Sequence, residues 1–103
     1  MYINGNMADF ETIKDTLAPI LKRNGVDFAA VFGSYAKGQA DNDSDVDLLV
    51  RFSEPKSLLD MAGVEMEIED SLGKEVDLVT EDALSPYIKD NVIKESRVIY
   101  GKR

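Results

Sequence analysis

Two carboxylates in this sequence have a spacing that suits metal chemistry. Asp45 and Asp47 lie two residues apart at the start of an apolar run that ends at Phe52. Side chains of a β-strand alternate between its two faces, so we expect both carboxylates on one face and Val46 on the other. Two anions held together repel each other unless a cation lies between them. The pattern therefore predicts a site for one divalent metal ion, or for two ions about 4 Å apart.

A third carboxylate has a similar setting further along the chain. Glu75, Asp77 and Val79 share one face of a stretch, residues 75–80, that is typical of a strand. If this strand pairs beside the one that carries the Asp-x-Asp pattern, Asp77 can complete a three-carboxylate site.

The dipeptide Gly33-Ser34 offers a complementary group. It follows the apolar run 28–32, which predicts a buried strand. Glycine at a strand-to-helix turn lets a ligand approach the backbone closely, and the first N–H groups of a helix point outward. Alone, such a dipeptide is also typical of an ordinary turn. Beside a carboxylate-metal site, it predicts a turn that binds the phosphates of a nucleoside triphosphate.

The composition narrows this chemistry. The 103 residues include no Cys and no His, which excludes thiolate zinc sites, cysteine nucleophiles and Ser-His-Asp triads. Any metal must bind to oxygen ligands, which favours Mg²⁺, Mn²⁺ or Ca²⁺. Twelve Lys and Arg against 20 Asp and Glu give a net charge of −8, so we expect no direct nucleic-acid binding. With neither a membrane-length apolar stretch nor a signal peptide, the expected location is the cytoplasm, away from membranes.

The acidic segment 41–47 has two other interpretations. Charge runs usually form solvated loops, but here the alternation continues into an apolar strand. An EF-hand calcium loop opens with the same Asp-x-Asp-x-Asp pattern. Counted from Asp41, however, position six is Val46 rather than Gly and position twelve is Phe52 rather than Glu. The calcium-loop interpretation therefore fails.

Apolar residues at helical spacing alternate with short apolar runs, which predicts one α/β domain over residues 1–103, with the polar residues 1–7 loose. The expected elements, in chain order, are a helix over 8–24 that Pro19 kinks or breaks near Ala18, strand 28–32, a helical turn at 35–40, a polar loop at 41–44, strand 45–52, a helix capped by Ser57 and Gly73, strand 75–80, a helix opened by Ser85-Pro86, and a short strand 98–100.

Two of these helices have predicted apolar faces. The helix that follows Ser57 has its stripe at Leu58, Met61, Ala62, Ile68 and Leu72, with Glu65 the one charged residue in that register. In the last helix, we expect Tyr87 to be a packing residue rather than one that stacks on a base.

Gly33-Ser34, ten residues (35–44) and then Asp45-Val46-Asp47 resemble the signature of the polymerase-β-like nucleotidyltransferases, in particular of the minimal nucleotidyltransferases (MNT). The resemblance covers roughly residues 26–100. It implies a small mixed β-sheet with helices packed against it, two metal-binding Asp on one strand and a third carboxylate on a neighbour that activates the acceptor hydroxyl. Carried over to this chain, the implied catalytic and metal-binding residues are Asp45, Asp47 and Asp77, with Gly33, Ser34 and Lys37 at the triphosphate. Relatives commonly have Arg at the position of Lys37, so a charge remains there but bidentate geometry does not.

The resemblance also implies an activity and a partner. It implies Mg²⁺-dependent transfer of a nucleoside monophosphate, AMP from ATP, to a hydroxyl group. MNT proteins are commonly antitoxins paired with a HEPN-domain toxin, a helical ribonuclease, and some transfer AMP to a tyrosine of that toxin. A short chain leaves little room for a substrate domain, so we expect a partner to supply the acceptor. An antitoxin that neutralises by contact alone is the alternative hypothesis, and nucleic-acid polymerisation is disfavoured because no basic groove is evident.

Overall fold

The computed structural model describes residues 10–33, 36 and 45–102. The elements in these ranges are α1 (Phe10–Arg23), β1 (Val26–Phe32), β2 (Val46–Phe52), α2 (Leu58–Leu72), β3 (Val76–Thr80), the short 3₁₀ helix η1 (Glu81–Ala83), α3 (Pro86–Glu95) and β4 (Arg97–Gly101). The predicted helical turn at 35–40, the loop at 41–44 and residues 1–7 lie outside the described ranges, apart from residue 36. None of the helices in these ranges has the length and apolar character needed to cross a membrane.

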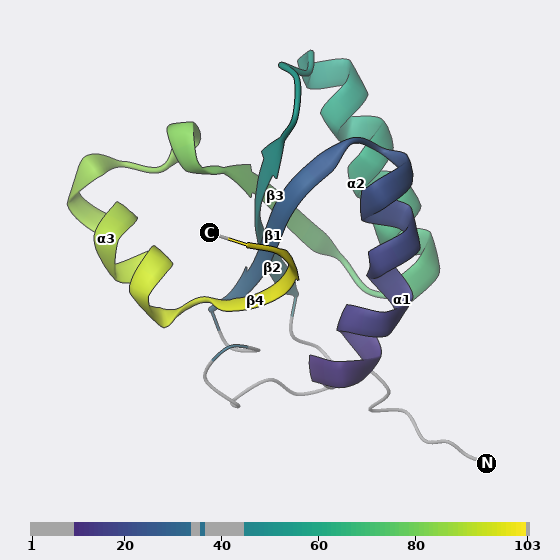
Figure 1. Cartoon of the computed structure of the whole chain (residues 1–103), viewed down its shortest axis with the longest axis horizontal. Coiled ribbons are helices and arrows are strands. Elements are labelled where there is room, and N and C mark those ends of the chain that lie inside the picture. The colour runs from purple at the N-terminus through teal and green to yellow at the C-terminus, as the bar shows by residue number, and fades with distance from the viewer. Residues whose placement is uncertain (1–9, 34–35, 37–44, 103) are drawn as a thin grey trace.

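The four strands form one mixed sheet in the order β3-β2-β1-β4. β1 is antiparallel to both β2 and β4, whereas β2 and β3 are parallel. Helices α1 and α2 lie together on one side of the sheet, and α3 lies on the other side (Figure 1). This arrangement confirms the predicted α/β class with a small mixed sheet and helices packed against it.

The hydrophobic core lies between the sheet and the α1–α2 layer. Alternate residues of the central strands, among them Val46, Leu48 and Val50, are fully buried in it. α1 covers them with Ile13, Leu17 and Leu21, which follow one another at four residues, a helical spacing as the sequence predicted. One face of the sheet is therefore apolar and covered, whereas the other face carries polar side chains together with the buried apolar residues Phe28, Ala30 and Leu49.

Both predicted caps of α2 are present. The Ser57 hydroxyl accepts a hydrogen bond from the Asp60 backbone N–H at 3.0 Å. Gly73 ends the helix in the left-handed conformation, at φ 69°, and its N–H donates to the Glu69 carbonyl. Such local signals depend only on neighbouring residues, which is why the sequence predicts them well.

Pro19 does not break α1 near Ala18, so that part of the expectation is wrong. The helix is continuous from Phe10 to Arg23 with Pro19 inside it. Proline leaves the carbonyl four residues earlier, that of Asp15, without its usual donor. Because Asp15 and Pro19 are both exposed, water can hydrate that carbonyl. Burial of Leu17 on one side of Pro19 and of Ile20 on the other then holds the helix together.

The predicted apolar face of α2 is only partly correct. Ile68 is fully buried, but Leu58 is 85% exposed and Ala62 is also exposed. Val64, which the predicted stripe omitted, is buried instead. The helix packs on α1 and β3 through its later turns, so the apolar residues of its first turn have no described element over them.

Tyr87 does not pack as expected. It lies in the first turn of α3 and is 94% exposed, and no residue of that helix is buried. Ser85 nevertheless caps the helix as predicted, because its hydroxyl accepts from the Tyr87 N–H. The helix is thus set by local signals, while its apolar residues remain largely uncovered within the described chain.

The corrected face of α2 can be tested by matched truncations. We expect Ile68→Ala to lower the free energy of unfolding by about 2–5 kcal/mol, because it leaves a cavity in the core. Leu58→Ala should change it by less than about 0.5 kcal/mol, because that side chain is already in water. Urea denaturation of the two variants measures both values, and equal losses would contradict the observed packing.

Candidate active site

The acidic site is built by the parallel pairing of β2 with β3. Asp47, the second residue of β2, lies opposite Asp77, the second residue of β3. Residues paired in this way project from the same face of a sheet. Asp45 immediately precedes β2 and is exposed. The two strands that carry the acidic residues are therefore neighbours, which is what the sequence analysis required for Asp77 to lie beside Asp47.

The apolar neighbours of each acidic residue determine which face it occupies. Val46 and Leu48 belong to the buried core, so the side chain of Asp47 between them points away from α1 and α2. Asp77 is placed in the same way between Val76, which is buried, and Leu78, which packs against the core. The carboxylates thus lie on the sheet face opposite the α1–α2 layer.

The charges of Asp45 and Asp77 act on the carboxyl group of Asp47. Partial burial raises the pKa of the Asp47 carboxyl above its ordinary value, and the negative charges of Asp77 and then Asp45 raise it further. All three effects disfavour the ionised form of Asp47. A cation among these groups would remove the repulsion, which is the chemistry that the Asp-x-Asp spacing predicted.

Gly33 ends β1 directly beside this site. Its backbone has φ +72°, and a Cβ atom built there would overlap the carboxylate of Asp47. Any other residue would therefore meet both backbone strain and a clash with the acidic pair. Ser34 and Lys37, the other two predicted triphosphate contacts, lie outside the described residues, so their placement stays a prediction.

Two residues that the sequence did not assign hold the strand of Asp77. The side chains of Glu65 and Glu69, both on α2, accept hydrogen bonds from the backbone N–H groups of Leu78 and Val76. The sequence contained one signal of this, namely the charged Glu65 in an otherwise apolar helical register. Without knowing that β3 passes beside α2, that signal could not be interpreted.

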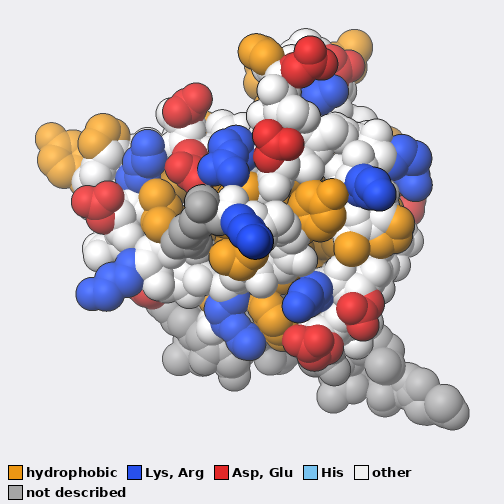
Figure 2. All heavy atoms as spheres, viewed as in Figure 1, with side chains coloured by type: hydrophobic (Ala, Val, Ile, Leu, Met, Phe, Trp, Pro, Cys, Tyr) orange, Lys and Arg blue, Asp and Glu red, His pale blue; other side chains and the backbone are white. Residues whose placement is uncertain are grey.

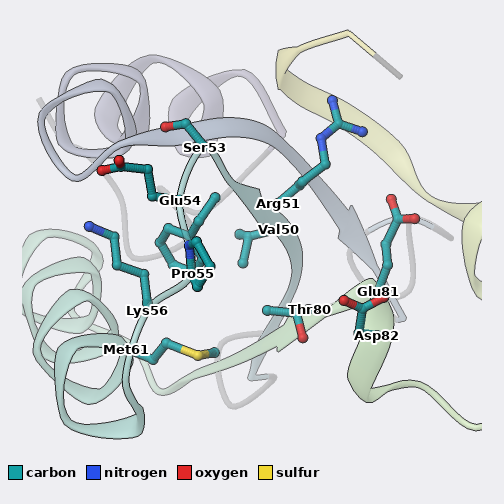
Figure 3. A pocket seen from close by; sticks show the side chains of 11 residues that line it. Val50, Arg51, Ser53, Glu54, Pro55, Lys56, Met61, Thr80, Glu81 and Asp82 are labelled. Carbon is teal, nitrogen blue, oxygen red and sulfur yellow. The ribbon is translucent and has the colours of Figure 1, made fainter.

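A separate pocket of about 420 Å³ lies at the far ends of the same two strands. It is bordered by the end of β2, the start of α2 and η1, with Thr80 and Met61 directed toward its centre (Figure 3). Arg51 and Lys56 contribute positive charge to it, and Glu54, Glu81 and Asp82 contribute negative charge. Because Asp47 and Asp77 occupy the opposite ends of β2 and β3, this pocket is distinct from the acidic site.

The acidic excess does not form one continuous patch on the face shown in Figure 2. Acidic and basic side chains are interspersed there, with hydrophobic side chains between them. The net charge of −8 is therefore not a guide to the local charge on this face.

Comparison with known proteins decides the family. Residues 15–103 match the family described as Polymerase beta, Nucleotidyltransferase. The chain belongs to this family. A protein of Methanocaldococcus jannaschii, provisionally named a protein adenylyltransferase, is 45% identical over 84 residues, which cover 82% of this chain and 90% of that protein. Protein adenylyltransferase MntA of Thermococcus cleftensis is 46% identical over 79 residues, 77% of this chain and 78% of that one.

Solved structures agree with this assignment. A structure provisionally described as a minimal nucleotidyltransferase is 38% identical with a TM-score of 0.76, and the match covers 89% of this chain and 97% of that one. A toxin–antitoxin structure with AMP-PNP has a TM-score of 0.77 at 21% identity, covering 87% and 74%. A tri-AMPylated HEPN toxin of Shewanella oneidensis in complex with MNT antitoxin matches with a TM-score of 0.71 at 18% identity, covering 89% and 72%. The last two likenesses show the fold alone.

The acidic pair of this nucleotidyltransferase fits Mg²⁺. Within residues 10–33, 36 and 45–102, no three acidic side chains are gathered closely enough to enclose a metal ion by themselves. Mg²⁺ does not need such a cage, because it usually keeps water molecules and binds one or two carboxylates together with substrate phosphates. Asp47 and Asp77 supply oxygen ligands of this kind, and the absence of a side chain at Gly33 lets the Asp47 carboxylate lie against the turn after β1.

The contact between Gly33 and Asp47 can be isolated with a second glycine. Gly73 has φ +69°, close to that of Gly33, but a Cβ there would meet no atom within 4 Å. We expect Gly73→Ala to lower the free energy of unfolding by about 1–2 kcal/mol, the cost of the left-handed backbone alone. Gly33→Ala should lower it further, because the methyl group displaces the Asp47 carboxylate. Urea denaturation measures both, and equal losses would contradict the contact.

Asp47→Asn should stabilise the metal-free protein at neutral pH. A carboxyl whose pKa is raised on folding lowers the free energy of unfolding when ionised, and this cost disappears below the unfolded value of about 3.9. In Mg²⁺-free buffer at pH 7, the variant should therefore have a higher Tm than the wild type, with the difference vanishing below about pH 4. Calorimetry across this pH range measures the effect. A lower Tm of the variant at pH 7 would show that Asp47 is not under repulsion.

Proposed function

We propose that this chain is an Mg²⁺-dependent protein adenylyltransferase that moves AMP from ATP to a hydroxyl of a partner protein and thereby acts as an antitoxin in the cytoplasm. The observation that carries the proposal is the parallel register of Asp47 and Asp77 beside Gly33. Relatives at 45% and 46% identity that are named protein adenylyltransferases support the reaction type.

The chemistry assigns a role to each acidic residue. Asp45 and Asp47 would hold Mg²⁺ together with the phosphates of ATP, whose negative charge the ion offsets when bound. Asp77 lies across from Asp47 and would orient the acceptor hydroxyl and take its proton. The hydroxyl oxygen forms a bond to the α-phosphorus, and the bond from that phosphorus to the pyrophosphate oxygen breaks. AMP then remains on the acceptor, and pyrophosphate leaves.

The turn after β1 would bind the triphosphate. Gly33 leaves the backbone open beside Asp47, and we assign the Ser34 hydroxyl and the Lys37 ammonium to the phosphate oxygens. The toxin–antitoxin structure that holds AMP-PNP, an analogue of ATP, supports ATP as the nucleotide. Lys37 would act as a point charge here, since an ammonium group cannot form the bidentate contact of an arginine.

We further propose that the acceptor is a tyrosine of a HEPN-domain toxin. The AMPylated HEPN toxin seen in complex with an MNT antitoxin supports this partner and this modification. A partner bound in front of the sheet face of Asp47 and Asp77 would bring its hydroxyl to the α-phosphorus.

Label transfer tests the proposal. The purified chain is incubated with Mg²⁺, α-labelled ATP and a HEPN-domain protein that co-purifies with it, and mass spectrometry locates the modified residue. We expect Asp47→Asn and Asp77→Asn each to reduce transfer by about 100-fold or more, because each removes a group that acts at the reacting atoms. Asp70→Asn, at an exposed carboxylate on α2, is the matched control and should retain full transfer.

The same experiment separates catalysis from binding. Toxin that is neutralised without label, and equally well by Asp47→Asn, would overturn the catalytic proposal and support neutralisation by contact alone. Label on nucleic acid rather than on protein would overturn the proposed acceptor.

A further inference from the structure

Asp77 lies on a strand at the edge of the sheet. Among the residues that the structure describes, β3 pairs only with β2. The Val46 N–H donates to the Glu75 carbonyl, which shows that Glu75 turns its backbone groups toward β2. Backbone groups alternate along a strand, so those of Val76 and Leu78 face away from the sheet. An edge strand with open N–H groups is prone to fray or to pair with another chain.

Two carboxylates of α2 occupy these outward positions. Glu69 Oε2 accepts from the Val76 N–H at 3.0 Å, and Glu65 Oε1 accepts from the Leu78 N–H at 3.1 Å. The two acceptors are four residues apart on a helix, which is about 6 Å along its axis. The two donors are two residues apart on a strand, which is about 6.6 Å. The helix and strand spacings therefore match, and the pair of bonds brackets Asp77.

We propose that Glu65 and Glu69 are positioning residues that hold Asp77 in register opposite Asp47 for nucleotidyl transfer. The inference rests on the proposed function, because it takes Asp77 to be the group that orients the acceptor. Neither glutamate contacts the reacting atoms. Each acts through the backbone beside Asp77, and hydrogen bonds with an ionised acceptor are roughly twice as strong as neutral ones.

This role accounts for a charge in the apolar register of α2. Glu65 and Glu69 are both half-buried, although burying a carboxylate without partners is costly. The backbone donors of β3 supply the missing partners. The strand in turn gains on its outer side the acceptors that a fifth strand would otherwise provide. Asp77 is thereby held from both sides, by β2 through the sheet and by α2 through the two carboxylates.

Paired substitutions test the proposal in the full chain. Glu65→Ala with Glu69→Ala removes both acceptors, whereas Glu65→Gln with Glu69→Gln keeps a carbonyl oxygen at each position and removes only the charge. The control is Glu67→Ala on the same helix, whose carboxylate instead bonds to Asn24 and Arg23 at the end of α1. Amide exchange by NMR reports on β3, with the amides of the central strand β1 as reference. Steady-state transfer gives kcat and KM for ATP.

In the alanine pair, we expect the amides of Val76 and Leu78 to exchange about tenfold faster, the effect of losing roughly one hydrogen bond. Its kcat should fall by about tenfold or more, while its KM for ATP should stay within about twofold of the wild-type value. Misplacing a reacting group lowers turnover rather than nucleotide binding. In the glutamine pair, the exchange rates of the two amides and the kcat should both return most of the way to the wild-type values. Glu67→Ala should change neither, even where it lowers Tm.

Distinct results would overturn the positioning role. Unchanged exchange at Val76 and Leu78 in the alanine pair would show that the glutamates do not hold the strand. A lower Tm with unchanged kcat would show a structural role only, and a glutamine pair as impaired as the alanine pair would show that charge, not the acceptor, matters. If the wild type transfers no label at all, the proposed function fails, and the exchange data still decide whether the glutamates hold β3.

Discussion

Two carboxylates facing each other across adjacent parallel strands create an electrostatic cost around which this protein is arranged. Strands in a sheet are about 4.8 Å apart. Because Asp47 and Asp77 are paired across β2 and β3, the backbone holds the two residues at close range. Partial burial raises the pKa of the Asp47 carboxyl, and the negative charges of Asp77 and Asp45 raise it further. A fold that keeps this arrangement gives up stability when both groups are ionised, and a cation between them would offset that cost.

The acidic site and the hydrophobic core lie on opposite faces of the sheet. Val46 and Leu48 face α1 and α2 and are fully buried, while Asp47 between them faces the other side. The apolar layer can therefore be packed closely without contact with the charges. Gly33 lies where the turn approaches the site, because a side chain there would occupy the position of the Asp47 carboxylate. The acidic pair extends from the central strand β2 onto the edge strand β3.

Many local features of the fold could be predicted from the residues alone, because they depend only on neighbours in the sequence. Strand alternation placed Asp45 and Asp47 on one face, and the hydroxyl of Ser57 with the left-handed Gly73 marked both ends of α2. The order of helices and strands followed from apolar spacing. Pro19 is the exception among local signals: its effect depends on whether water can reach the freed carbonyl, and that depends on which side of α1 faces the solvent.

What the sequence could not supply is which distant segments meet. Nothing in residues 75–80 states that β3 lies beside β2 rather than at the other edge, nor that the register sets Asp77 against Asp47. The roles of Glu65 and Glu69 depend on the same pairing, because a carboxylate on a helix can accept from a strand only where the two pass within hydrogen-bond distance. Alternation, capping and helical spacing are properties of a few consecutive residues, and the sequence settles them. Strand order, register and the burial of each face come from packing across the whole chain, and only the folded structure shows them.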